Sequence, residues 1–242
     1  MVMKHSKSYP DLLRDKGYMS CCAQKGEAYK PTMVEQVANC ITHGIFVIPS
    51  IVALYYMLAH STSHQHYFCS LVYGIALVML FTVSTTFHVL CLFTSQRTDA
   101  WRRMFHLGDR FMIYVFIAAS YMPWLNLQDF GDYGYRVSTV VWAAAVAGVV
   151  YSFLYHEKYK MLETILYLCL GFLPAIPLAS RSVTGMFELA CGAVLYIIGV
   201  IFFKSDGRIP FAHAIWHIFG STAAWVHHYG TWTHFYQKEK LL

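Results

Sequence analysis

The chain has 242 residues, of which 57% are hydrophobic and only 13% are charged. This composition excludes a soluble compact domain, because long stretches carry no ionisable group that could face water. The formal net charge of +5 does not require a nucleic-acid partner, since basic residues at the ends of membrane spans meet anionic lipid headgroups. The sequence therefore predicts an integral membrane protein that binds no nucleic acid.

Seven apolar windows follow one another along the chain. No Asp, Glu, Lys or Arg occurs between Gln36 and Gln96, a run too long for one crossing of roughly 20 residues, so the chain must turn within the polar segment 61–66. The same rule predicts spans at residues 40–60, 67–93, 110–127, 138–155, 161–179, 186–203 and 211–233. We therefore predict an all-α fold, a polytopic membrane protein built as a seven-transmembrane helix bundle.

The polar ends divide the chain into three parts. Residues 1–35 mix Lys, Ser, Gly, Pro and Tyr without helical periodicity, which predicts a mostly disordered tail. Residues 36–236 form the predicted transmembrane domain, and residues 237–242 form a short second tail. No apolar core of a cleavable signal peptide lies near the start, so the first span is expected to act as an uncleaved signal.

The basic residues predict the orientation. Fourteen of the 18 Lys and Arg residues fall on the side of the N-terminus and four on the opposite side. The positive-inside rule then places the N-terminus in the cytosol and the C-terminus in a lumen or outside the cell. This is the reverse of a G-protein-coupled receptor.

Five polar residues are predicted to lie in the cytosolic third of the bilayer. His213 and His217 occupy the first two turns of the last span, four residues apart and hence on one helix face. Ser84 and His88 lie near the cytosolic end of the second span, and Asp109 opens the third. The charge count that set the orientation used none of these residues.

Three neutral imidazoles with one open position describe a catalytic zinc site, in which the metal lowers the pKa of bound water. Residues 214–216 between the paired histidines are Ala, Ile and Trp, with no Glu to act as base. Asp109 is then the natural proton acceptor, and Ser84 is a hydroxyl that orients water or a substrate carbonyl. The alternative is a hydrogen-bonded cluster that only holds helices together, and the residues alone leave both open.

Several further residues have more than one interpretation each. Glu35, Asn39 and His43 form a polar stripe at the start of the first span, which either supports the metal ligands, contacts lipid headgroups, or serves as a helix cap with bundle contacts. His106 is a rival ligand, for which an interfacial histidine is the favoured interpretation. The spacing of His60 and His64 repeats that of the proposed ligands on the other side of the membrane, so spacing alone does not decide.

The seven cysteines are scattered, without CxxC spacing, and indicate neither a disulfide framework nor a thiolate zinc site. Cys21 and Cys22 are candidates for palmitoylation in a basic tail, although unmodified thiols are favoured. The last span has no lysine for a retinal Schiff base, and no chain of charges at the middle of the bilayer suggests a transporter.

The order Ser84, His88, Asp109, His213 and His217, with the sequence FKSDGRIPFAHAIWH at residues 203–217, resembles the progestin and adipoQ receptor family, which includes the hemolysin III group. The stretches AASYMPWLNL at 118–127 and FLYHEKYK at 153–160 look like its monocyte to macrophage differentiation factor branch. The likeness covers roughly residues 30 to 236. It implies a seven-helix bundle holding Zn²⁺ through His88, His213 and His217, with Asp109 and Ser84 beside the metal-bound water.

The resemblance leaves three functions open. The first is a zinc hydrolase that acts on a lipid amide of the ceramide type, or on an ester, with a membrane lipid as substrate. The second is a Golgi scaffold that regulates Ras signalling, in which zinc is only structural. The third is a receptor for an extracellular ligand, which the very short outer loops disfavour. By the same resemblance the Golgi membrane is the expected location, with the plasma membrane, endosome or lysosome as alternatives.

Overall fold

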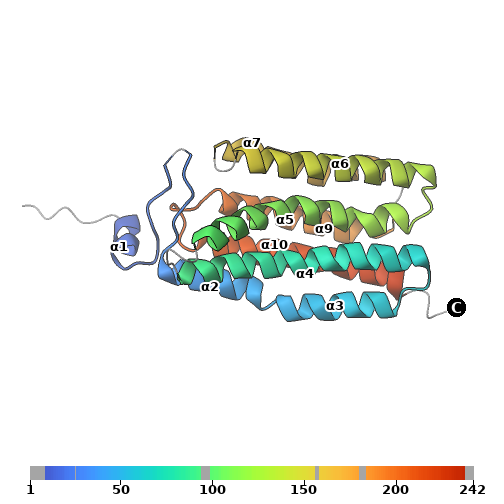
Figure 1. Cartoon of the computed structure of the whole chain (residues 1–242), viewed down its shortest axis with the longest axis horizontal. Coiled ribbons are helices and arrows are strands. Elements are labelled where there is room, and N and C mark those ends of the chain that lie inside the picture. Colours follow the sequence, from blue (N-terminus) through green and yellow to red (C-terminus); the bar gives the residue numbers. More distant parts are fainter. Residues whose placement is uncertain (1–8, 25, 94–98, 156–157, 180–183, 238–242) are drawn as a thin grey trace, which may run out of the picture.

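The computed structural model describes residues 9–24, 26–93, 99–155, 158–179 and 184–237, and every regular element in these ranges is a helix. The helices are α1 (Tyr9–Asp15), α2 (Met33–Gly44), α3 (Val47–Ala59), α4 (His64–Leu92), α5 (Asp99–Asn126), α6 (Asp132–Tyr155), α7 (Lys160–Phe172), α8 (Ala175–Ala179), α9 (Met186–Phe203), α10 (Ala212–Thr231) and the short π-helix η1 (Trp232–Tyr236). Figure 1 shows the labelled helices from α2 to α10 aligned along the long axis, with α2 and α3 end to end and α1 at one end of the bundle.

In the described part of the chain the helices after α1 form seven rods, because α2 continues into α3, α7 into α8 and α10 into η1. The first rod breaks just before Pro49, which lies in the first turn of α3, and Pro174 separates α7 from α8, as expected of a residue that interrupts helical hydrogen bonding. The seven rods correspond to the seven predicted windows. The all-α membrane bundle is therefore confirmed.

Five of the rods are long and apolar enough to cross a membrane by length and composition alone: 33–59, 64–92, 132–155, 160–179 and 186–203. The other two, α5 and α10, have 28 and 20 residues but contain more polar side chains. Asp109 lies on α5, and both histidines of the predicted pair lie on α10. Polar groups inside a spanning helix are costly unless they face the bundle interior or a functional site. We therefore expect a functional site on these two helices.

The helices α2, α4, α5 and α6 all start several residues before the predicted apolar windows, and side-chain interactions account for two of these starts. The first begins at Met33, inside the predicted tail, because Thr32 caps it: Thr32 Oγ1 accepts from Glu35 N at 3.3 Å, and the Glu35 carboxylate accepts from Thr32 N at 2.9 Å. This reciprocal capping satisfies amide groups that would otherwise lack partners. Likewise α5 begins at Asp99, where Arg102 pairs with the Asp99 carboxylate at 3.1 Å.

The polar N-terminal segment lies across the end of the bundle where α2 begins (Figure 1). Met19 is 2% exposed, and Arg14 donates to the carbonyl of Gly207, in the loop between α9 and α10, at 3.4 Å. Gly207 has φ of 75°, and a Cβ there would lie 2.6 Å from the Cys22 backbone, so this close approach requires glycine. The predicted domain boundary stays a prediction, and residues 1–8 and most of the tail 237–242 lie outside the described residues.

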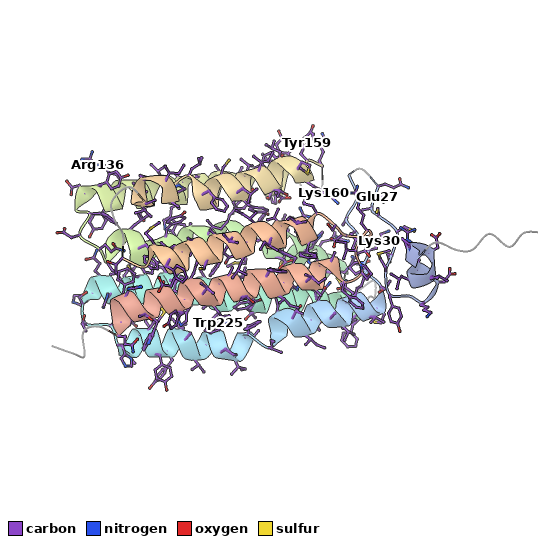
Figure 2. The ribbon with its side chains drawn as sticks, turned by 180° about the vertical axis from the view of Figure 1, so that it is seen from behind. Glu27, Lys30, Arg136, Tyr159, Lys160 and Trp225 are labelled. Atoms are coloured by element: carbon purple, nitrogen blue, oxygen red, sulfur yellow. The ribbon has the colours of Figure 1, made fainter. Side chains whose placement is uncertain are left out.

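The two ends of the bundle differ in charge. Figure 2 shows Lys30, Tyr159 and Lys160 at one end, where Lys160 donates to the Glu27 carbonyl, and Arg136 at the opposite end. Seven basic residues that entered the sequence count lie outside the described residues: Lys4, Lys7, Lys25, Arg97, Arg181, Lys238 and Lys240. The gathering of the described basic residues agrees with the predicted orientation, whose cellular sides stay a prediction.

Candidate metal centre

The candidate metal centre lies where the last turns of α4 meet the first turns of α10. His88 comes from α4, and His213 and His217 come from α10. Each offers one ligand atom, and these atoms all lie within 4.8 Å of one another. The ring centroids are 5.1 Å apart for His88 and His217, 5.4 Å for His88 and His213, and 4.7 Å for His213 and His217. The structure thus brings together the three histidines selected from the sequence, in a geometry that could hold a metal ion.

Gln36 holds the ring of His88. The Gln36 amide oxygen lies 2.8 Å from His88 Nδ1, and because an amide oxygen only accepts, Nδ1 carries the hydrogen. His88 Nε2 therefore has its lone pair available, and this atom is buried without a hydrogen-bond partner among the described residues. A buried imidazole nitrogen without a proton or a partner is what a metal ion requires.

The two histidines of α10 are held in the same manner. Thr42 Oγ1 lies 3.1 Å from His217 Nδ1 and donates its own hydrogen to the Ala38 carbonyl at 2.9 Å, so it accepts from the imidazole. His213 Nδ1 lies 3.5 Å from a carboxylate oxygen of Asp206. All three imidazoles thus have a polar partner at Nδ1, which leaves all three Nε2 atoms for the ligand position.

The loop 204–211, which carries Asp206, ends in an unusual backbone conformation. Phe211, the residue before α10, has φ of 57°. This left-handed conformation is rare for a bulky residue and costs on the order of 1 kcal/mol. It turns the chain from the loop into α10 immediately before His213. The strained residue therefore lies directly before the two histidines of this helix.

Asp109 and Ser84 lie beside the histidines. The electrostatic neighbours of the Asp109 carboxylate include His213 and Ser84, and Asp109 itself is not a member of the group of converging ligand atoms. Ser84 is fully buried, and its hydroxyl oxygen has no hydrogen-bond partner in the part of the chain that the structure describes. An acid next to the ligands, and not among them, is placed to accept or deliver a proton.

The polar stripe of the first span divides into two roles. The His43 ring stacks on His217 with centroids 3.7 Å apart and planes 16° apart. Asn39 is fully buried, and both atoms of its amide lack hydrogen-bond partners among the described residues. Glu35 instead caps α2 and accepts from the Tyr29 hydroxyl at 2.9 Å. Burial, with a smaller contribution from Glu35, raises the pKa of Tyr29, so its phenol remains a donor at physiological pH.

The remaining histidine candidates lie elsewhere. His106 stacks on Phe87 with centroids 4.7 Å apart and is not in the group of converging ligand atoms. His60 Nδ1 contacts the Tyr56 carbonyl at 2.9 Å. In the described ranges, His88, His213 and His217 are the only group of three or more His, Cys, Asp or Glu side chains whose ligand atoms converge.

The sequence analysis missed the three residues that orient the ligands: Gln36, Thr42 and Asp206. Gln36 is adjacent to Glu35, which was selected, and Asp206 lies within the motif at 203–217. Helical spacing offered a signal for Gln36 and Thr42, since they lie three residues before and three residues after Asn39, which was selected. The donor set of three converging imidazoles, two of them buried, nevertheless fits a divalent metal ion.

Comparison with known proteins shows which sequences the chain is similar to. The model of the family described as haemolysin-III related matches residues 32–228, a range that includes all five selected residues. The chain is 45% identical to monocyte to macrophage differentiation factor of Homo sapiens over 221 residues, 91% of this chain and 92% of that protein. It is 34% identical to hemolysin-3 homolog of Bacillus subtilis (strain 168) over 202 residues, 80% of this chain and 92% of that protein.

Proposed function

The chain belongs to the haemolysin-III-related family, and from that premise we propose that it is a zinc-dependent hydrolase of a membrane lipid amide, located in the Golgi membrane. One observation supports this proposal above the others. Three histidines from two helices converge, two of them buried and His213 partly exposed, and each has its Nδ1 nitrogen engaged by a partner. Such outer partners are typical of histidines that bind metals.

Zinc is the proposed metal because catalytic zinc sites use three protein ligands and keep one position open. The binding residues would be His88, His213 and His217. When bound, the ion polarises a carbonyl group and makes water a stronger nucleophile near neutral pH.

The neighbouring side chains supply the proton transfers and the positioning. Asp109 accepts the proton of the attacking water and returns it to the leaving nitrogen, as a general base and then a general acid. Ser84 donates to the substrate carbonyl. The unpaired Asn39 amide offers one donor and one acceptor, which match the C=O and N–H of a secondary amide. An ester lacks the N–H, so Asn39 favours an amide substrate.

A Golgi scaffold that regulates a signalling protein such as Ras is the second candidate. The basic residues at the end where α2 begins, with the N-terminal segment lying over it (Figure 2), would offer the partner surface. In that case the metal serves stability only. The two candidate functions predict different effects on amide hydrolysis when Asp109 loses its charge while the metal is retained.

We therefore propose a comparison of wild-type and Asp109→Asn proteins in lipid nanodiscs, with a ceramide-type amide and the matching ester. The wild type is expected to hydrolyse the amide, and Asp109→Asn to retain its metal while losing at least about 100-fold in rate, the usual contribution of a general base. Metal content of both proteins serves as the control. Equal turnover by the two proteins removes Asp109 from the mechanism, and no turnover by the wild type supports the scaffold.

A further inference from the structure

A second candidate site lies at the other end of the bundle. A groove of about 670 Å³ runs along the surface between α4, α5 and α6. Its walls include Phe68 and Tyr135, each 56% exposed, and Val146, 59% exposed, so the groove opens sideways from the bundle, toward lipid in a membrane. From Val72, the deepest α4 residue of the groove, to His88 is about 24 Å of helix rise, which separates it from the histidines.

The groove is polar at one end and apolar at the other. Its polar end consists of Gln65 in the first turn of α4, Asn126 at the end of α5 and Tyr135 near the start of α6. Its deep end consists of Val72, Ala143 and Val146. Tyr135 and Val146 are eleven residues apart on α6, or about 16 Å, which is half of a hydrocarbon core of about 30 Å. The groove thus follows one leaflet from the headgroup level to the bilayer centre, near the end marked by Arg136 in Figure 2.

The hydrogen bonds at the polar end leave two acceptors. Gln65 Nε2 donates to the Asn126 carbonyl and, at 3.1 Å, to the Tyr135 hydroxyl. Asn126 Nδ2 donates to the Met122 carbonyl at 2.9 Å. In the described part of the chain no hydrogen bond is recorded to the side-chain oxygen of Gln65 or of Asn126, and no acidic or basic side chain lines the groove. Two acceptors without a charge match an uncharged head with two hydroxyl groups.

In the middle of the groove, the polar side chains Ser138 and Trp142 already have hydrogen-bond partners within the protein. Ser138 and Trp142 both donate to the sulfur of Met122, at 3.4 and 3.2 Å. With these two hydrogens engaged inside the protein, the deeper wall presents apolar surface to its occupant. An acyl chain is the matching part of a lipid, because apolar contacts need no directional partner.

We propose that this groove binds one monoacylglycerol, with its two free hydroxyl groups at Gln65 and Asn126 and its single acyl chain along α6. A volume of about 670 Å³ is the size of a pocket for one small ligand and favours one chain over two. The absence of a lining cation disfavours a fatty acid, and the pair of acceptors disfavours a sterol with one hydroxyl. The inference does not depend on the metal centre or on hydrolysis.

The test uses the full chain in phosphatidylcholine nanodiscs and a monooleoylglycerol that carries a photoactivatable diazirine in its chain. Cross-linked peptides are identified by mass spectrometry. Labelling is expected on α4 and α6 beside the groove, and excess unlabelled monooleoylglycerol is expected to suppress it. Labelling spread evenly over the lipid-facing helices would overturn the proposal.

Variants separate the groove from the rest of the surface. Ala143→Trp fills the groove and is expected to lower labelling about tenfold, which corresponds to the loss of one good contact. Ala144→Trp is the matched control, since Ala144 is equally exposed to the outside and does not line the groove. Equal labelling of both variants contradicts the site. Stronger competition by oleate, cholesterol or ceramide than by monooleoylglycerol contradicts the proposed ligand.

Discussion

Gln36 contacts the candidate metal centre through one hydrogen bond, so its role can be isolated. The amide oxygen fixes the hydrogen on His88 Nδ1. Gln36→Leu is expected to lower metal affinity about 10- to 100-fold, the usual effect of removing an outer partner of a metal ligand, while the fold is kept. Titration of the purified apoprotein with metal measures this affinity.

Gln36→Glu provides the control, because it retains an oxygen acceptor at the same place. Its metal affinity is expected to stay near that of the wild type. If Gln36→Leu and Gln36→Glu bind the metal equally well, the hydrogen bond to His88 does not position the ligand.

Substitution of Asn39 tests whether this residue contributes to function or to the stability of the fold. Both polar atoms of its fully buried amide lack partners among the residues that the structure describes, and such burial costs roughly 1–3 kcal/mol. Asn39→Leu is therefore expected to leave the unfolding temperature unchanged or to raise it, while lowering amide hydrolysis. Thermal unfolding and turnover, measured on the same sample, check this. A marked loss of stability would show instead that Asn39 supports the bundle.

At the residue scale, sequence reasoning found what is chemically rare and missed what is common. Histidines inside apolar spans stand out because a polar group there needs a partner, and this selected His88 and His217. Gln36 and Thr42 lie near the start of the first span, close to the predicted membrane surface. Polar residues are common at such positions and do not stand out. Which of them meets an imidazole depends on how α2 packs against α4 and α10, which no single helix reveals.

At the element scale, a buried ion pair attaches α7 to α5. Arg110 pairs with Glu163, whose side chain is only 6% exposed, and Ser152 and Tyr167 donate to the other Glu163 oxygen at 2.5 and 3.1 Å. The pair involves helices α5, α6 and α7, and it includes the neighbour of Asp109. It therefore couples the outer helices to the helix that carries the proposed base.

Glu163→Ala is expected to lower stability by about 3–5 kcal/mol, because it leaves a buried cation without its partner. The double substitution Arg110→Met with Glu163→Leu is expected to cost clearly less, since it removes both charges. Denaturation in detergent micelles measures both. A double variant less stable than Glu163→Ala would contradict the account of the ion pair.

Helix positions were largely predictable, because hydropathy reports where a chain can meet hydrocarbon. The window at 186–203 coincides with α9. The starts of α2 and α5 were wrong by several residues, since helices continue past the hydrocarbon when caps and ion pairs support them, as at Thr32 and Asp99. The short helix α1 has Pro10 in its first turn and an Asp11–Arg14 pair at 3.3 Å, signals too brief for periodicity to reveal.

At the scale of the whole molecule, two sites of different chemistry lie at opposite ends of one bundle. The histidines lie at the end where α2 begins, and the groove lies at the end where α4 and α6 begin. The orientation predicted from basic residues places the first in the cytosolic leaflet and the second in the other. Each site would then meet lipid from a different leaflet.

That orientation is testable with cleavable tags. A protease-sensitive tag at the N-terminus is expected to be cut from the cytosolic side of sealed membrane vesicles, and a C-terminal tag only after the vesicles are opened. The excess of basic residues on one side is the physical reason. The reverse pattern of cleavage would exchange the leaflets assigned to the two sites.

The metal content of the purified protein tests the central claim most directly. We expect about one zinc per chain in the wild type, since three histidines hold one ion, and its loss in His88→Ala and His217→Ala. His60→Ala, which alters a histidine outside the converging group, is expected to keep the metal. Inductively coupled plasma mass spectrometry on protein purified without chelators gives this number. A wild type without metal, or His217→Ala with unchanged metal, would contradict the assignment of the centre.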